Sequence, residues 1–208
     1  MMKEDKIHWV YSSESIQQLE DRYDEWASTY ETHLEETTGY AIPQETMIAV
    51  TKLLDTNAKI LDAGAGTGLT GAALAEAGYH ELHAIDLSGQ MLQIAADKGV
   101  YLTLAKMKLG DRLLFDTDSF QGVVITGVFT TGHARPDSLD ELVRIVTPGG
   151  YIIFSINLES FHNLGFKEKF DELSDSCKWE EAYQSGQFLG LPNYETEVFH
   201  QVWGFKVL

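Results

Sequence analysis

A glycine-rich loop at residues 58–68 constrains the fold of this chain more than any other stretch of its sequence. It opens with an apolar run that ends in Asp62, and glycines follow at positions 64, 66 and 68. A helical pattern continues over 69–77, so the segment predicts a buried strand, a tight turn and a helix start. Because glycine adopts positive φ and has no Cβ, a ligand can lie against the main chain of such a turn. The unpaired N–H groups of the helix start favour an anionic group above it.

The spacing of the glycines separates two classes of nucleotide-like cofactor. The dinucleotide pattern Gly-x-Gly-x-x-Gly would require a third glycine at position 69, where this chain has Leu69. The third glycine is Gly68, so the fit to NAD is imperfect. A second apolar run closes with Asp86, where a strand-end carboxylate can accept hydrogen bonds from ribose hydroxyls. Either cofactor contains a ribose, so Asp86 does not decide between them.

The loop and the segment after it carry a family resemblance. Ile60–Gly68 followed by Ala84–Leu92 resembles motifs I and II of the class I S-adenosylmethionine (SAM)-dependent methyltransferases. Leu109–Asp111 and Val143–Tyr151 are similar to later motifs of that family, and the likeness extends over roughly residues 20–156. Within the family, Tyr23–Glu31 and the general layout resemble the methyltransferase-like protein encoded in the Williams-Beuren syndrome region.

The resemblance implies a fold and a cofactor. The fold is a Rossmann-like, doubly wound α/β structure, in which a seven-stranded and mostly parallel sheet carries an antiparallel last strand. The cofactor is S-adenosyl-L-methionine, and its product is S-adenosyl-L-homocysteine. The corresponding activity is methyl transfer.

The resemblance also implies the residues that bind the cofactor. Asp86 would bind the ribose, Asp111 would accept a hydrogen bond from the adenine amino group, and Leu87 would lie beside the adenine ring. Tyr23 or Tyr30 would cover the methionine end, although an aromatic stripe at this spacing can equally belong to the core. The complete set of expected cofactor-binding residues is Tyr23, Tyr30, Asp62, Gly64, Ala65, Gly66, Asp86, Leu87, Met91, Gly110, Asp111 and Thr126.

Catalytic residues are less defined, because methyl transfer from SAM needs alignment more than it needs acid–base chemistry. A general base is required only if the acceptor is protonated. His133, after the fourth predicted strand, and His162, after the fifth, are the two candidates, and each can equally be structural or solvent-exposed. No Asn-Pro-Pro-Tyr-like sequence follows the fourth strand, which argues against the amine chemistry of relatives that act on DNA or protein.

Hydrophobic spacing predicts the elements around this core. One or two amphipathic helices are expected over 12–34, a helix from Pro43 to Leu54, and alternating strands and helices over 59–156. Beyond them we expect a loop over 157–165, a charged helix over 166–176, and two antiparallel strands over 178–208, one of them at 194–203. The chain is predicted to be a single domain over 1–208. Its parts are N-terminal helices over the cofactor site (1–56), a SAM-binding core (57–156) and a C-terminal helix with antiparallel strands (157–208).

Composition narrows the partners. The net charge is −17 and no Lys/Arg cluster is present, which argues against nucleic acid as a substrate. A small-molecule acceptor fits better, and an acidic surface would suit a cationic one, but solvated acid that keeps the protein soluble explains the charge equally well. No apolar run is long enough to span a membrane, the start lacks the apolar core of a signal peptide, and the single cysteine, Cys177, agrees with a reducing compartment. We therefore expect a cytoplasmic protein without membrane contact or metal, either a monomer or a homodimer.

Three other functions stay open from the sequence. A SAM-binding protein that has lost catalysis would carry the same cofactor motifs. A protein methyltransferase could hold a lysine-rich peptide in an acidic groove. An NAD-dependent oxidoreductase is disfavoured by Leu69 and by the later motifs.

Overall fold

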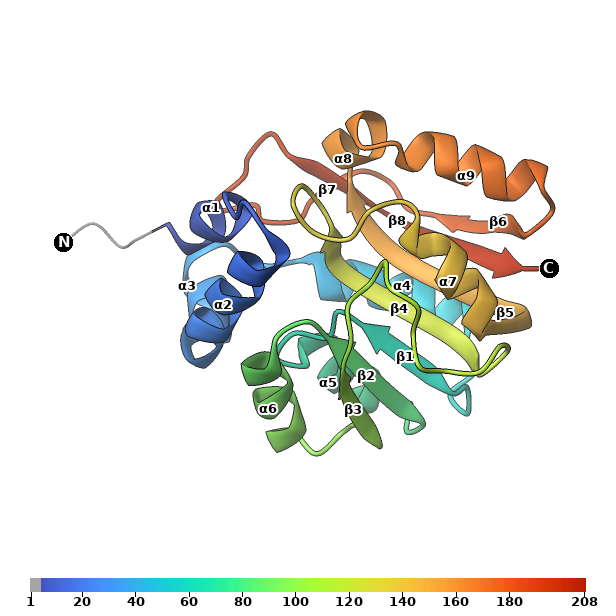
Figure 1. Cartoon of the computed structure of the whole chain (residues 1–208), viewed down its shortest axis with the longest axis horizontal. Coiled ribbons are helices and arrows are strands. Elements are labelled where there is room, and N and C mark those ends of the chain that lie inside the picture. Colours follow the sequence, from blue (N-terminus) through green and yellow to red (C-terminus); the bar gives the residue numbers. More distant parts are fainter. Residues whose placement is uncertain (1–4) are drawn as a thin grey trace.

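One mixed sheet runs through the computed structural model, which describes residues 5–208 (Figure 1). The strand order is β3-β2-β1-β4-β5-β8-β6, and a short β7 pairs with β8 beside this path. The first five strands are mutually parallel, whereas β8 is antiparallel to β5, β6 and β7. The predicted Rossmann-like fold with an antiparallel last strand is therefore confirmed, with β7 as an added edge segment. The strands are β1 (Ile60–Ala63), β2 (Leu82–Asp86), β3 (Thr103–Lys106), β4 (Phe120–Phe129), β5 (Val146–Asn157), β6 (Trp179–Gln184), β7 (Phe188–Leu189) and β8 (Phe199–Val207).

Helices cover both faces of this sheet. Alternate residues of the central strand β4 face opposite sides: Val123 and Ile125 pack in one buried cluster with α7 and α9, and Val124 packs in another with α4 and α5. This alternation explains the unbroken β-branched run of the strand, because both of its faces are covered. The helices are α1 (Lys6–Tyr11), α2 (Ile16–Trp26), the 3-10 turn η1 (Ala27–Thr29), α3 (Tyr30–Thr37), α4 (Ile42–Leu53), α5 (Leu69–Glu76), α6 (Gly89–Asp97), α7 (Ser138–Ile145), α8 (Leu158–Asn163) and α9 (Phe166–Asp175).

A third apolar cluster belongs to the N-terminal helices. In Figure 1, α1, α2 and α3 (blue) lie beyond the carboxyl ends of β1 and β4 rather than on a face of the sheet. Their buried side chains, among them Leu19, Trp26 and Leu34, pack on one another and on Leu191 from the segment before β8. These helices thus form a cap over the sheet end where α/β folds bind ligands.

Two sequence predictions about the C-terminal quarter were wrong. Residues 158–163 form the helix α8 instead of a loop, because the Asn157 side chain accepts a hydrogen bond from the Ser160 backbone N–H at 2.6 Å and caps its start. The strand expected from 194 begins only at Phe199. Its partner β5 ends at Asn157, opposite His200, so residues before 199 have no β5 strand to pair with.

Candidate functional site

The glycine loop after β1 uses two of its glycines for different purposes. Gly64 has φ +85°, and a Cβ there would lie 2.4 Å from the Val128 Cγ2 atom, so glycine is needed for close packing against β4. Gly66 has φ +54°, yet a Cβ at this position would meet no atom within 4 Å. The backbone at Gly66 therefore borders open space, as expected where a ligand approaches the main chain.

Asp86, at the end of β2, is fixed beside this loop. Its Oδ2 atom accepts a hydrogen bond from the Gly66 backbone N–H, and its Oδ1 atom accepts one from the Ser88 N–H, each at 2.8 Å. Burial raises the pKa of Asp86, and these two backbone bonds oppose the shift. Each carboxylate oxygen can accept a second hydrogen bond, so the group can still receive donors from a ligand.

Asp62, at the end of β1, has a different environment. It is fully buried, its Oδ2 atom accepts a hydrogen bond from the Tyr101 hydroxyl at 2.6 Å, and its Oδ1 atom has no partner among the described residues. Burial raises the pKa of Asp62 to about 7. Tyr101 also contacts Gly71 in α5, where a Cβ would lie 2.1 Å from the tyrosine oxygen. Asp62 therefore joins strand, helix and Tyr101 beneath the loop and does not line the cavity above it.

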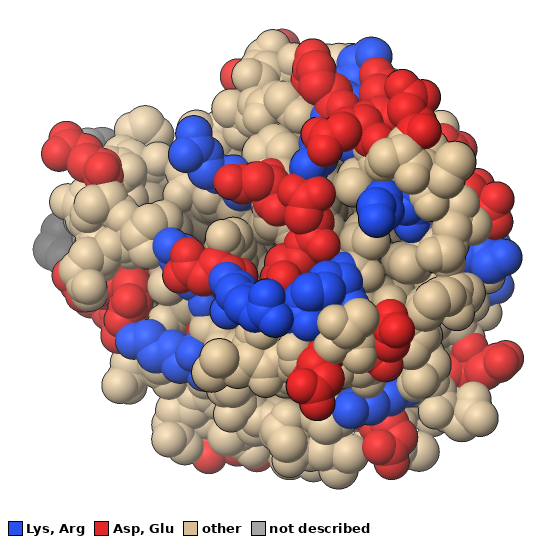
Figure 2. All heavy atoms as spheres, turned by 45° about the vertical axis from the view of Figure 1, so that its right-hand side comes forward, with Lys and Arg blue, Asp and Glu red and all other residues tan. Residues whose placement is uncertain are grey.

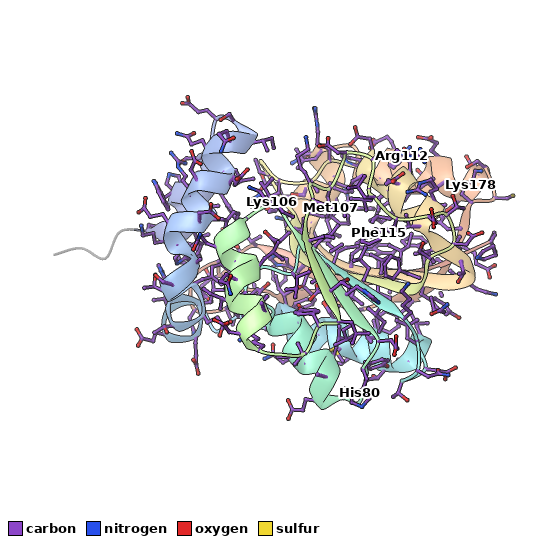
Figure 3. All side chains as sticks on the ribbon, turned by 60° about the horizontal axis from the view of Figure 1, so that its bottom comes forward. His80, Lys106, Met107, Arg112, Phe115 and Lys178 are labelled. Atoms are coloured by element: carbon purple, nitrogen blue, oxygen red, sulfur yellow. The ribbon has the colours of Figure 1, made fainter. Side chains whose placement is uncertain are left out.

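A pocket lies between the loop, the end of β4 and the N-terminal cap. Figure 3 labels Met107, which follows β3 and lies between α6 and the segment before α7. Apolar side chains gather around the α6 side of the pocket, and polar ones lie near the loop and β4. The wall is formed by Ile16, Leu19, Tyr23, Tyr30, Gly64, Gly66, Asp86, Leu87, Met91, Met107, Lys108, Leu109, Thr126, Gly127, Val128, His133 and Ala134.

The structure brings together most of the predicted site residues, but not all. Those on the wall are Tyr23, Tyr30, Gly64, Gly66, Asp86, Leu87, Met91, Thr126 and His133. Those away from it are Asp62, Ala65, Gly110, Asp111 and His162. The Asp111 carboxylate pairs with the Lys108 ammonium at 2.8 Å and is mostly exposed, and His162 lies exposed on α8. Lys108 and Leu109 line the pocket but were not among the predicted site residues, although Leu109 opens the Leu109–Asp111 motif and Lys108 directly precedes it.

His133 forms a hydrogen-bonded pair with Tyr23 from the cap. The His133 Nδ1 atom lies 3.0 Å from the Thr131 carbonyl oxygen, which can only accept, so Nδ1 carries the proton. Nε2 therefore accepts the hydrogen bond from the Tyr23 hydroxyl, at 2.7 Å. Burial lowers the pKa of His133 and raises that of Tyr23, so both groups are neutral near pH 7. The pair presents a hydroxyl backed by a neutral imidazole.

A second cavity adjoins the first pocket and shares Tyr23, Tyr30 and Gly127 with it. It reaches from the cap towards the end of β5 and the start of β8. Its lining consists of Ile7, Tyr11, Tyr23, Trp26, Tyr30, Leu34, Tyr40, Ile42, Gly127, Phe129, Thr130, Ser155, Asn157, Leu191 and His200. No motif in the sequence pointed to this cavity, because its residues come from distant segments.

Surface charge and groups of metal-binding side chains are two further features that could mark a functional site. On the face shown in Figure 2, a short strip of Lys and Arg side chains is bordered by Asp and Glu, and no wide basic area is seen. Within residues 5–208, no group of three or more His, Cys, Asp or Glu side chains is arranged to hold a metal ion. No helix in that range is both long and apolar enough to cross a membrane.

Comparison with known proteins gives three consistent results. Residues 60–150 match the family model described as a methyltransferase domain. Human methyltransferase-like protein 27 is 32% identical over 173 residues, which are 81% of this chain and 67% of that protein. Among solved structures, the [4+2]-cyclase SpnF superimposes with a TM-score of 0.72 at 13% identity, covering 94% of this chain and 97% of the cyclase.

Proposed function

We propose that this chain, which belongs to the class I SAM-dependent methyltransferases, transfers the methyl group of SAM to a small-molecule acceptor. The observation that carries the proposal is the junction of two cavities at Tyr23, Tyr30 and Gly127. One cavity has the features of a nucleoside site, and the other is a separate space for a second reactant. Holding two reactants against each other is the main contribution that a protein makes to this chemistry.

The residues of the first pocket fit SAM. Gly66 leaves space along its main chain, and Asp86 is held in place with lone pairs left for ribose hydroxyls. Leu87, Met91 and Leu109 give an apolar wall for the adenine ring. Bound SAM supplies a methyl group that its sulfonium already activates. Asp62 and Asp111 do not line the pocket. We therefore assign Asp62 to supporting the glycine loop, and we assign the hydrogen bond to the adenine amino group to residues next to Asp111.

The Tyr23–His133 pair offers a route for the acceptor's proton. As the acceptor forms its bond to the methyl carbon, its proton passes to the Tyr23 oxygen, and the Tyr23 proton passes to His133 Nε2. Neither transfer leaves a tyrosinate, which the buried site disfavours. His162, exposed on α8, has no comparable route, so His133 is the base that we propose.

Calorimetric titration with S-adenosylhomocysteine, with NAD as a parallel ligand, tests the cofactor assignment. We expect binding of the first ligand alone, and binding of NAD alone would refute the proposal. For the base, Tyr23→Phe and His133→Asn should both slow methyl transfer while leaving affinity for S-adenosylhomocysteine within about threefold of wild type, because general-base catalysis acts on the chemical step. Full turnover by His133→Asn at every pH would remove His133 from this role.

Two alternatives remain distinguishable from the main proposal. The likeness to a cyclase shows that this fold also occurs in a protein named for another reaction, so a SAM-binding protein without methyl transfer is the second candidate. It would bind S-adenosylhomocysteine yet methylate nothing in a broad acceptor screen. A protein methyltransferase would instead transfer label to polypeptides. We also propose a relationship to the methyltransferase-like subgroup and a cytoplasmic site of action, supported by the identity with human methyltransferase-like protein 27 and the single cysteine respectively.

A further inference from the structure

The second cavity lies where a methyl acceptor has to bind if the first holds SAM, and the inference below rests on that proposed function. The end of β4 and the residue after it line both spaces. Thr126 and Val128 line the first, Phe129 and Thr130 line the second, and Gly127 borders both. Tyr23 and Tyr30 stand at the boundary between them. A molecule in the second cavity would therefore reach the cofactor past these two tyrosines.

The walls of this cavity are aromatic and uncharged. Five of the lining side chains are Tyr11, Tyr23, Trp26, Tyr30 and Tyr40, and none of the lining residues is Lys, Arg, Asp or Glu. The rings pack edge to face or stacked, with Trp26 centred 4.7 Å from Tyr30 and 6.3 Å from Tyr23. Such walls favour a flat apolar molecule and supply no counter-ion for a charged one.

The titratable groups of the cavity indicate that it disfavours charge of either sign. Burial raises the pKa of Tyr11 to about 12 and raises the pKa of Tyr30 and Tyr40, so negative charge is unfavourable there. Burial also lowers the pKa of His200 to about 4, so positive charge is unfavourable as well. An anionic or cationic acceptor would pay the same desolvation cost on entering.

His200 supplies a polar atom without a partner. The residue is 8% exposed, and its Nδ1 atom has no hydrogen-bond partner among the described residues. Because burial lowers the pKa of His200, the ring is neutral near pH 7 and one of its two nitrogens presents a lone pair. Gly190 lets the imidazole pack closely against the main chain, since a Cβ at 190 would lie 2.7 Å from Nδ1. A buried polar atom of this kind is costly unless a hydrogen-bond partner reaches it.

We infer that the second cavity is the acceptor chamber and that it selects a small, flat, uncharged molecule whose O–H or N–H donates to His200 Nδ1. His200 is then a positioning residue that holds one polar hydrogen of the acceptor, and the atom that is methylated gives its own proton to the Tyr23–His133 pair. The acceptor class is that of flat, neutral rings with two polar hydrogens, such as diphenols and hydroxylated ring N–H compounds. Carboxylic acids and protonated amines would meet no oppositely charged side chain in the wall, so we expect both to be disfavoured.

Four matched probes test this selection by titration against the protein saturated with S-adenosylhomocysteine. They are p-cresol, p-methylanisole, p-toluate and p-methylbenzylammonium, which share one ring and differ in donor and charge. We expect p-cresol to bind at least about tenfold more tightly than each of the others, since it alone is neutral and donates a hydrogen bond. Equal or tighter binding of p-toluate or the ammonium, or no binding by any probe, would overturn the inference.

Two variants connect the selection to His200. His200→Leu removes Nδ1, and Gly190→Ala places a Cβ 2.7 Å from Nδ1, so that the imidazole has to move. In both variants p-cresol should bind no better than p-methylanisole. Both variants should keep wild-type affinity for S-adenosylhomocysteine, which also serves as the folding control. Persistence of the p-cresol preference in a variant that binds S-adenosylhomocysteine would contradict the role of His200. Failure of the wild-type protein to bind S-adenosylhomocysteine would instead count against the proposed function itself.

Discussion

The two cavities that meet at Tyr23, Tyr30 and Gly127 are built in opposite ways. In the first, the groups that we assign to the cofactor come from short consecutive stretches, the glycine loop after β1 and the end of β2 with the residues that follow it, and they include the carboxylate of Asp86. The second collects uncharged side chains from α1, α2, α3, β4, β5 and β8, which are far apart in the sequence. One is defined by backbone geometry and the other by tertiary packing.

The difference has a functional consequence. A backbone-built pocket changes little with side-chain identity, so it suits a cofactor that must be bound in the same way by many proteins. A chamber made of side chains changes with each substitution, and so it can adapt to a particular acceptor. Ligand binding in the first cavity should therefore be sensitive to the space beside the backbone, and ligand binding in the second should be sensitive to charge.

The largest effect is expected from Gly66→Ala. A Cβ at this position meets no protein atom within 4 Å, so it would occupy only the space that we assign to the cofactor. Affinity for S-adenosylhomocysteine should fall by at least ~100-fold, about 3 kcal/mol. The free protein should lose only ~1–2 kcal/mol from the positive φ. Gly99 has φ +66° and equally open surroundings, so Gly99→Ala should lose similar stability and keep its affinity. Equal affinities in the two variants would show that the main chain at Gly66 does not border the cofactor.

The pH dependence of stability should show that the second cavity disfavours charge. The pKa of His200 is about 4 in the folded protein and 6.5 unfolded, so the unfolded state binds more protons between these values. The stability that neutral His200 allows is present above pH 6.5 and falls by about 3 kcal/mol as the pH drops towards 4. Urea unfolding across this range should show a shallower fall in His200→Leu than in wild type. His80→Ala, at an exposed position, should keep the wild-type slope.

For Asp62, which lies beneath the glycine loop, the free energy of unfolding should change with pH in the opposite direction. Its pKa rises from 3.8 to about 7 on folding, so the folded state binds the extra proton and stability is lost as pH rises through this interval. The free energy of unfolding of Asp62→Asn, minus that of wild type, should therefore be more positive at pH 8 than at pH 4, as measured by urea unfolding. The same slope in both proteins would mean that Asp62 stays ionised beneath the loop.

Asp86→Asn is expected to weaken cofactor binding without removing it. Charge-assisted hydrogen bonds to ribose contribute about 1.5–3 kcal/mol, so affinity for S-adenosylhomocysteine should fall roughly 10- to 100-fold. Asp62→Asn is the matched control, because it changes the acid of the neighbouring strand end away from the pocket wall. Similar losses in the two variants would mean that loop support, rather than ribose binding, is what Asp86 provides.

The same contrast explains what could be predicted from the sequence. The glycine loop, Asp86 and the parallel strands follow from local spacing, and the structure has them where the sequence indicates. The position of Asp111, off the wall and paired with Lys108, depends on how one turn is oriented, which residue type does not specify. The polar alternation at 194–198 is typical of a strand, but pairing requires a partner and β5 has already ended. The second cavity has no sequence signature because packing alone brings its residues together.

The smallest predicted effect concerns the link between the cap and the cofactor side. The Ser88 hydroxyl, which caps α6 by accepting from the Met91 N–H, donates to the Asp24 carboxylate of α2 at 2.5 Å, and the Gln90 N–H donates to the same oxygen at 3.1 Å. Asp24→Ala removes this link and leaves the α6 cap intact, so we expect a loss of about 1 kcal/mol in the free energy of unfolding.

Binding separates the cap's two possible contributions. Tyr23 and Tyr30 can close the boundary between the cavities only if α2 is held against α6. In that case Asp24→Ala should lower the affinity for S-adenosylhomocysteine by about threefold to tenfold, as expected for one lost hydrogen bond. Asp21→Ala, at an exposed position on the same helix, should leave affinity unchanged. Loss of stability in Asp24→Ala with unchanged affinity would mean that the cap serves the acceptor chamber alone, and the p-cresol titration of this variant would then show the weakening instead.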